Sequence, residues 1–221
     1  MRLRNKPWAA DVLAGCPYYI SEPTANAGRW KEEFGTGHPI WLEVGCGKGL
    51  YIAGTAPSHP EIDLIGADIK GLMLAYGIRN VDEAFGGAEN VRNVRFLSVD
   101  AMRISQAFSS PDTVEKIVIN FCNPWPKKGD NKKRLIHPRQ LTQYREFLTD
   151  GGEILFKTDD EELFSIAPEY FGSCGFSIRE ILYDYYATHD PSEEVLTEHE
   201  RKFMEQGLPI HYIRAVKEQQ T

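Results

Sequence analysis

The stretch IWLEVGCGKGLYIAGTAPSHPEIDLIGAD, residues 40–68, determines the expected fold. Residues 40–44 are mostly apolar and predict a short buried strand, which leads directly into a Gly-x-Gly-x-Gly turn at residues 45–49. A short helix should follow, and then a second strand over residues 62–67 that ends in Asp68. Strand, glycine turn, helix and strand form a βαβ unit, so this stretch predicts an α/β fold with a parallel sheet.

The same alternation continues to the end of the chain. Together with the two strands above, it predicts a Rossmann-like, mostly parallel seven-stranded sheet with helices on both faces. Residues 1–39 show no strong periodicity and are expected to form an N-terminal arm, whereas residues 40–221 form the main domain. The further strands are expected at 94–99, 116–121, 153–156, 176–183 and 210–216, and the further helices at 71–85, 102–108, 138–148, 161–171 and 198–205.

Polar residues at the expected strand ends form a candidate cofactor site. Gly45 and Gly47 let the backbone approach a ligand closely, and Asp68 is placed to accept hydrogen bonds from ribose hydroxyls. Asp100 follows the next strand, where it can accept from the exocyclic amine of adenine. Dinucleotides and S-adenosylmethionine both bind such units, but the tight glycine turn and Glu43 favour the cationic S-adenosylmethionine. Each feature alone is equally typical of a plain turn or a surface carboxylate; their order along successive strands favours a cofactor site.

A second informative stretch is VEKIVINFCNPWPKKGDNKKRLIHPR, residues 114–139. Its apolar strand breaks at Asn123-Pro-Trp-Pro, where the prolines restrict the backbone around an amide and around the indole of Trp125. Residues 127–139 then carry six basic side chains and one acidic one. Trp125 alone is typical of a core aromatic, and a charge run alone of a solvated loop. Together, beside the cofactor site, they predict a base pocket next to phosphate contacts.

Composition limits the remaining possibilities. The chain has 221 residues, 42% of them apolar and 26% charged, which suits one globular α/β domain. The net charge of −7 argues against non-specific coating of nucleic acid, although a local basic patch can still bind it. The four cysteines show no metal-binding or disulfide spacing, so we expect free thiols, no metal site and a cytoplasmic protein without a membrane span. The sequence does not distinguish a monomer from a homodimer.

Several motifs, taken together, resemble those of the bacterial tRNA (guanine-N7-)-methyltransferases, and the resemblance extends over nearly the whole chain. That family has a Rossmann-like class I methyltransferase fold. The resemblance implies transfer of a methyl group from S-adenosylmethionine to N7 of a guanosine in the variable loop of tRNA. The motifs that carry it are RNKPW at 4–8, LEVGCGKG at 42–49, NPWPKK at 123–128, KKRL at 132–135, FKTD at 156–159 and TEHERKF at 197–203.

The resemblance also implies roles for particular residues. The chain departs from the family pattern at two of them: Asn123 replaces the acid usually assigned as catalytic, and His199 replaces a tyrosine. Asn123 is implied as the catalytic residue and as a cofactor contact. The other implied cofactor contacts are Glu43, Gly45, Gly47, Asp68 and Asp100, and the implied substrate contacts are Lys127, Asp159, Thr197, Glu198, His199 and Glu200.

The amide at position 123 is compatible with catalysis. Guanine N7 carries a lone pair and no proton, so its methylation needs alignment rather than a general base. We therefore expect a slower enzyme rather than an inactive one. Two alternatives stay open: an Asn-Pro-aromatic turn is also typical of enzymes that methylate exocyclic amines, and loss of the acid is compatible with a catalytically silent tRNA-binding module.

Overall fold

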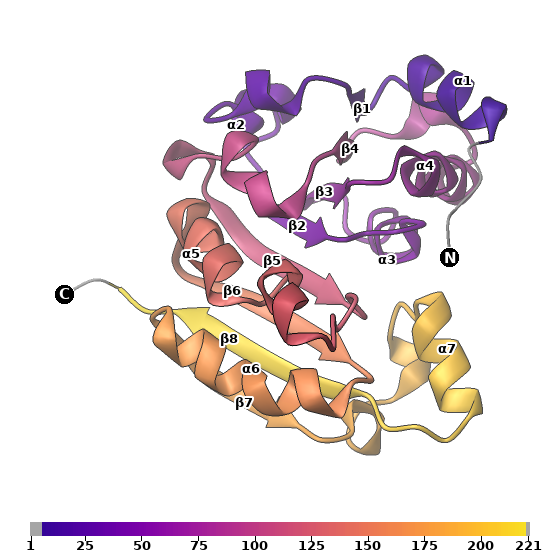
Figure 1. The fold of residues 1–221 in the computed structure, drawn as a ribbon. Coiled ribbons are helices and arrows are strands. Elements are labelled where there is room, and N and C mark those ends of the chain that lie inside the picture. The colour runs from indigo at the N-terminus through magenta and orange to yellow at the C-terminus, as the bar shows by residue number, and fades with distance from the viewer. Residues whose placement is uncertain (1–5, 220–221) are drawn as a thin grey trace.

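The computed structural model describes residues 6–219 and contains one mixed sheet in the order β1-β4-β3-β2-β5-β6-β8-β7 (Figure 1). The strands pair in parallel except that β8 runs antiparallel to both β6 and β7. The predicted α/β fold with a mostly parallel sheet is therefore confirmed. The strands are β1 Tyr19–Ile20, β2 Ile40–Val44, β3 Asp63–Asp68, β4 Val94–Ser98, β5 Val114–Asn120, β6 Leu148–Thr158, β7 Phe176–Leu182 and β8 His211–Lys217.

The sheet has eight strands rather than the seven expected. The extra strand, β1, comes from the N-terminal arm and pairs in parallel with the edge of β4. A strand of two residues is too short to show the alternation from which strands are predicted. The arm is also held by two buried aromatic residues, since Trp30 Nε1 donates to Ala107 O at 2.7 Å and the Tyr18 hydroxyl bonds Asp82 at 2.6 Å. Residues 7–34 of the arm thus contribute to the same sheet and core as the main domain.

Helices cover both faces of the sheet because successive strand residues point to opposite sides. In β2, Ile40 and Leu42 belong to a core with α2, α5 and α6, whereas Trp41 between them packs against a second core built on α3 and α4. Helix α1 joins this second core. The helices are α1 Pro7–Gly15, α2 Trp30–Phe34, α3 Leu50–Thr55, α4 Gly71–Phe85, α5 Pro138–Phe147, α6 Glu161–Ser173 and α7 Glu198–Glu205.

The carboxyl ends of β2, β3, β5 and β6 all point toward the side of the molecule where α7 lies (Figure 1). Open parallel sheets bind their ligands at this edge. The order of the strands therefore places the glycine turn, the ends of β3 and β4, and the loop after β5 around one region. Within residues 6–219, no helix combines the length and the apolar character that a membrane crossing requires.

Candidate active site

The glycine turn between β2 and α3 is fixed by backbone hydrogen bonds. The N–H groups of Gly45 and Cys46 both donate to Ala67 O at the end of β3, at 2.8 and 3.1 Å. Gly45 has a φ of +78°, and a Cβ at this position would lie 3.0 Å from Leu135 Cδ1. A side chain here would therefore be strained and would also crowd the loop that follows β5. The turn keeps a bare backbone surface facing the sheet edge.

One cavity, of about 350 Å³, lies between this turn, the ends of β3 and β4, and the loop after β5. Asp68 and Asp100 both line it, among mostly apolar neighbours. The oxygens of Asp68 accept from Gly47 N at 3.0 Å and Lys70 N at 2.8 Å, and Asp100 accepts from Met102 N at 2.9 Å. These bonds orient both carboxylates, and each oxygen has two acceptor positions, so capacity remains for a ligand.

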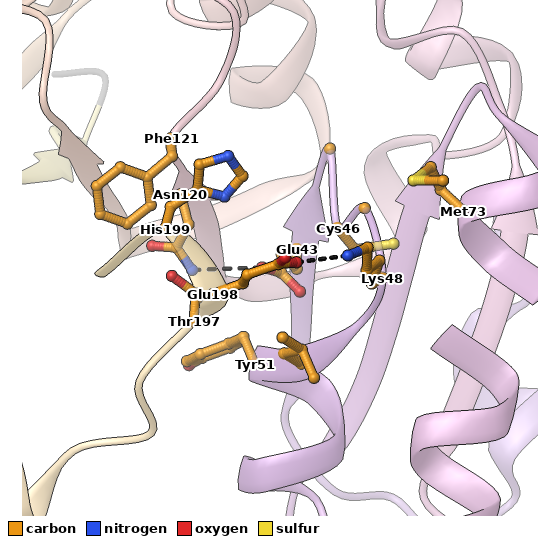
Figure 2. Close-up of a pocket in the computed structure, with 13 residues that line it drawn as sticks. Glu43, Cys46, Lys48, Tyr51, Met73, Asn120, Phe121, Thr197, Glu198 and His199 are labelled. Atoms are coloured by element: carbon orange, nitrogen blue, oxygen red, sulfur yellow. Dashed lines mark hydrogen bonds and ion pairs between the residues drawn. The ribbon is translucent and has the colours of Figure 1, made fainter. Parts of the chain in front are cut away.

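A second cavity, of about 160 Å³, also borders the glycine turn, and Figure 2 shows residues that line it. Glu43 lines it and is only 4% exposed. Its Oε1 accepts from Asn120 Nδ2 at 3.3 Å, whereas its Oε2 has no partner among the described residues. Burial raises the pKa of Glu43 to about 8; the hydrogen bond from Asn120 opposes this shift, and nearby negative charge adds to it. Because Gly45 lines both cavities, they meet at the turn.

The charges around the two cavities suit a ligand with a positive centre. The buried unpartnered oxygen of Glu43 is costly unless a donor or a cation reaches it. The nearby cation Lys48 is already paired with Glu198 at 2.6 Å, and Lys133 with Asp130 at 2.7 Å. An adenosine would match the larger cavity, which is lined by the carboxylates of Asp68 and Asp100. An aminoalkyl sulfonium would match the surroundings of Glu43. This donor set fits S-adenosylmethionine.

The start of α7 closes the smaller cavity. Thr197 caps the helix: its hydroxyl accepts from Glu200 N at 3.2 Å, and a Glu200 oxygen accepts from Thr197 N at 2.7 Å. The other oxygen of Glu200 accepts from Lys157 Nζ at 2.8 Å and from the Tyr186 hydroxyl at 2.9 Å. Burial would raise the pKa of Glu200, but Lys157 and the capping bonds outweigh it and hold that pKa below its usual value. Glu200 thus anchors α7 to the end of β6.

An aromatic pair forms another wall of the smaller cavity. Phe121 follows β5 with a φ of +49°, which is strained for a residue with a side chain. In this conformation its ring stacks on His199, with the ring centroids 5.8 Å apart and the planes 14° apart (Figure 2). Both residues line the cavity. The strained backbone therefore presents a flat face next to Glu43, as a planar base would require.

Comparison with known proteins places the chain in a family. A family model described as "Putative methyltransferase" matches residues 37–213. The chain is 45% identical over 219 residues to a "tRNA (guanine-N(7)-)-methyltransferase" of Clostridium beijerinckii, covering 99% of this chain and 100% of that protein. A relative of the same name from Acetivibrio thermocellus is 42% identical, covering 98% of this chain and 100% of that protein. The chain belongs to the tRNA (guanine-N7-)-methyltransferase family.

Solved structures agree with this family in fold. The 16S rRNA methyltransferase KamB matches with a TM-score of 0.63 at 12% identity, over 86% of this chain and 93% of that one. A mutant of the 16S rRNA (adenine(1408)-N(1))-methyltransferase from Catenulisporales acidiphilia, with cosubstrate SAM, gives 0.61 at 15% identity, over 86% and 90%. At these identities the likeness concerns the fold alone, and it confirms the predicted Rossmann-like methyltransferase sheet.

Apart from Glu200, the residues that the resemblance singled out fall into two groups in this member of the family. One group lines the cavities and includes all the expected cofactor residues except Asn123. The second group is exposed: Asn123, Lys127 and Asp159 lie at the sheet edge but are not among the residues that line either cavity. The cavity-lining group consists of Glu43, Gly45, Gly47, Asp68, Asp100, Thr197, Glu198 and His199, whereas Glu200 lies behind them in its buried ion pair.

Asn123 has a defined local contact in spite of its exposure. Its Oδ1 accepts from Trp125 N at 3.1 Å, which fixes the turn in which Trp125 has a φ of +46°. Arg134, 2% exposed, supports the same turn by donating from Nε to Pro124 O at 2.7 Å. Trp125 lines the larger cavity, and the Lys133 ammonium lies 4.7 Å from its ring centroid. The amide thus helps to place one wall of the larger cavity.

Some residues that line the smaller cavity are not among the predicted site residues, and Lys48, Asn120 and Phe121 are the most informative of them. Asn120 had a signal, because it is the polar last residue of an otherwise apolar strand that ends at the ligand-binding edge. The ion pair of Lys48 with Glu198 joins residues 150 positions apart, and no local pattern predicts it. The unusual backbone at Phe121 likewise depends on the following turn rather than on residue type.

We predict that Thr197→Ala weakens the cap of α7 and lowers the free energy of unfolding by about 1 kcal/mol. Thr197→Ser should keep the capping hydrogen bond and the wild-type stability. Thermal unfolding should show a fall of roughly 2–4 °C for the alanine variant. S-adenosylmethionine affinity, measured by calorimetry, should change little in either variant. An alanine variant as stable as wild type would show that the capping box contributes nothing to the position of α7.

Proposed function

We propose that this protein transfers a methyl group from S-adenosylmethionine to N7 of a guanosine in the variable loop of tRNA. The observation that carries the proposal is the unpartnered carboxylate oxygen of Glu43, buried where the two cavities meet. It supports a cationic methyl donor at the sheet edge, in a chain whose relatives are named for guanine-N7 methylation of tRNA. Such an enzyme would work on tRNA in the cytoplasm.

S-adenosylmethionine supplies an electrophilic methyl group on a sulfonium. The carboxylates of Asp68 and Asp100 would hold its ribose and adenine, and Glu43 would hold the positively charged end beside the glycine turn. Asn120 would support this contact by keeping the Glu43 carboxylate in a fixed orientation. Together these residues would exclude water and orient the bound donor beside Phe121 and His199, which line the same cavity.

No residue of the site has to remove a proton, because guanine N7 attacks through a lone pair. As the N7–methyl bond forms, the sulfur–methyl bond breaks and the sulfur keeps the electron pair, so the positive charge passes to the purine. Alignment and nearby negative charge therefore favour the transition state. We assign the orientation of guanine to Asn123, Asp159 and the Thr197–Glu200 segment, within which Glu200 acts by anchoring the others. Lys127 and the basic loop after it would contact tRNA phosphates.

Methylation of an exocyclic amine is the principal alternative, because a free amide oxygen after β5 could accept from such an amine. At Asn123 that oxygen accepts from Trp125 N and keeps one further acceptor position, so this hydrogen bond does not separate the two reactions. The relatives named for guanine-N7 methylation favour the N7 proposal. A silent tRNA-binding module would have no use for the buried carboxylate and its two cavities. Measurement of S-adenosylmethionine binding by calorimetry tests this third possibility, and absence of binding would support it.

The proposed function is tested by transfer of a labelled methyl group to an unmodified tRNA transcript, followed by digestion to nucleosides. We expect the label in 7-methylguanosine. A transcript whose variable-loop guanosine is replaced by adenosine is the matched control and should accept no label. Label in an N2-methylated guanosine or a methylated adenosine would overturn the proposal, and transfer to the control transcript would overturn the position within tRNA.

A further inference from the structure

A basic-aromatic strip runs along the outside of α1 and α4, next to the smaller cavity. It consists of Lys6, Trp8, Tyr76 and Arg79. The Lys6 ammonium donates to the Tyr76 hydroxyl at 2.9 Å, and the Arg79 guanidinium lies over the Trp8 ring, 3.7 Å from its centroid. Trp8 and Tyr76 meet edge to face, with centroids 5.0 Å apart. Figure 1 shows α1 packed beside α4 at this position.

The two cations of the strip are held by aromatic rings rather than by carboxylates. Among residues 6–219, eleven ion pairs within 4.0 Å involve a lysine or an arginine, and neither Lys6 nor Arg79 belongs to one. Both side chains are exposed. The hydrogen bond from Lys6 lowers the pKa of Tyr76, and the positive charges of Lys6, Lys48 and Arg79 add to this effect. The local field is therefore positive in a protein of net charge −7.

The packing of the strip suits a phosphate ligand. A guanidinium held over an aromatic ring keeps N–H donors for other partners, and these donors match two oxygens of one phosphate. Because the rings already restrict Lys6 and Arg79, binding would cost less side-chain entropy than it does for unrestrained surface cations. Carboxylate-paired cations, in contrast, would first have to exchange partners.

The strip also begins close to the site. Met73 of α4 lines the smaller cavity, and Arg79 lies six residues further along the same helix. At 1.5 Å per residue this is about 9 Å, a distance that a nucleotide next to the bound base can span. The basic loop after β5 lies at the larger cavity, which Lys133 lines. The two sets of cations thus flank the paired cavities.

We propose that the basic-aromatic strip binds the phosphodiester backbone of the substrate tRNA on the α4 side of the target nucleotide. This inference rests on the proposed function, because tRNA is the polyanion that the site would receive. It assigns Arg79, Tyr76 and Trp8, which lie outside the two cavities, to substrate binding. The strip and the basic loop would hold the RNA on opposite sides of the base.

The test is the salt dependence of tRNA affinity for a Lys6→Gln/Arg79→Gln double variant. Each lost phosphate contact should make the slope of log K against log salt shallower by ~0.7–0.9, so the double variant should differ from wild type by ~1.4–1.8. The matched control is Lys31→Gln/Arg179→Gln, which removes the same charge from exposed sites on α2 and β7. A Lys6→Arg/Arg79→Lys variant retains the charges and should keep the wild-type slope even if the packing is altered.

Methyl transfer by wild type is measured in the same experiment, so the two proposals can fail separately. If wild type transfers the methyl group to tRNA but the Lys6→Gln/Arg79→Gln variant and the control variant show the same slope, the strip does not bind tRNA. The proposed function then stands. Absence of any transfer to tRNA by wild type overturns the proposed function and the strip with it. A shallower slope only in the Lys6→Gln/Arg79→Gln variant, with unchanged S-adenosylmethionine affinity, supports the strip.

Discussion

Glu43→Gln is expected to lower the affinity for S-adenosylmethionine by about one to two orders of magnitude, because a hydrogen bond to a charged group contributes about 1.5–3 kcal/mol. The unpartnered Oε2 of Glu43 faces the smaller cavity, and an amide cannot offer a negative charge to a cationic ligand. For the same reason, binding to wild type should strengthen as pH rises toward 8, where Glu43 ionises.

The same substitution should have the opposite effect on the free protein. Burial raises the pKa of Glu43 from its usual 4.5 to about 8, so between these values the native state holds a proton that the unfolded chain has released. The stability contributed by this protonated carboxyl is complete below pH 4.5 and is lost as pH rises to 8. Glu43→Gln removes this loss. The stability of the variant relative to wild type should therefore increase between pH 4.5 and 8.

Calorimetry at several pH values gives the affinities, and denaturant unfolding of the free protein gives the stabilities. Glu83→Gln, an exposed change on α4 with the same chemistry, is the matched control and should follow wild type in both measurements. A Glu43→Gln variant with wild-type affinity would remove Glu43 from the cofactor site. A stability difference that does not change with pH would show that this carboxyl is ionised in the free protein.

Asn123→Asp is expected to raise kcat/KM for tRNA by roughly 10- to 100-fold, the effect of about 1.5–3 kcal/mol gained in the transition state. An aspartate keeps the acceptor for Trp125 N and adds negative charge at a residue to which we assign the orientation of guanine, whose purine becomes cationic on methylation. It also restores the acid that the resemblance to the family implies at this position. Initial rates with a tRNA transcript, at saturating S-adenosylmethionine, measure the change.

The control for this substitution is Asn123→Ala, which removes both the charge option and the hydrogen bond to Trp125 N. We expect it to be slower than wild type, since Trp125 would lose one of the contacts that hold it at the larger cavity. If the alanine variant matches wild type, position 123 takes no part in catalysis. If the alanine variant is slower but the aspartate variant is no faster, the residue acts only by supporting the turn.

Much of the fold could be predicted because its signals are local. Residues 71–85 and 198–205 carry helical periodicity or a capping sequence, and both helices begin and end where expected. The strand expected at 116–121 instead begins at Val114 and ends at Asn120, because tertiary pairing decides where a ladder begins and ends. The two residues of β1 are too few to show the alternation of apolar and polar residues that predicts a strand.

The candidate site was predictable where it depends on strand order and not where it depends on side-chain contacts. Asp68 and Asp100 follow parallel strands, so topology alone brings them to one cavity. Glu200, in contrast, resembled a substrate contact by motif, whereas the Thr-x-x-Glu spacing that it completes with Thr197 is also a capping-box signature. Its buried ion pair with Lys157, 43 residues away in sequence, is seen only in the three-dimensional structure.

The assignment of guanine N7 as the methyl acceptor can be tested on that atom itself. A tRNA with 7-deazaguanosine at the variable-loop position lacks only N7 and retains the exocyclic amine and the oxygen. We expect no transfer of labelled methyl to this tRNA, and full transfer to the same tRNA carrying guanosine. Equal transfer to both tRNAs would show that N7 is not the acceptor.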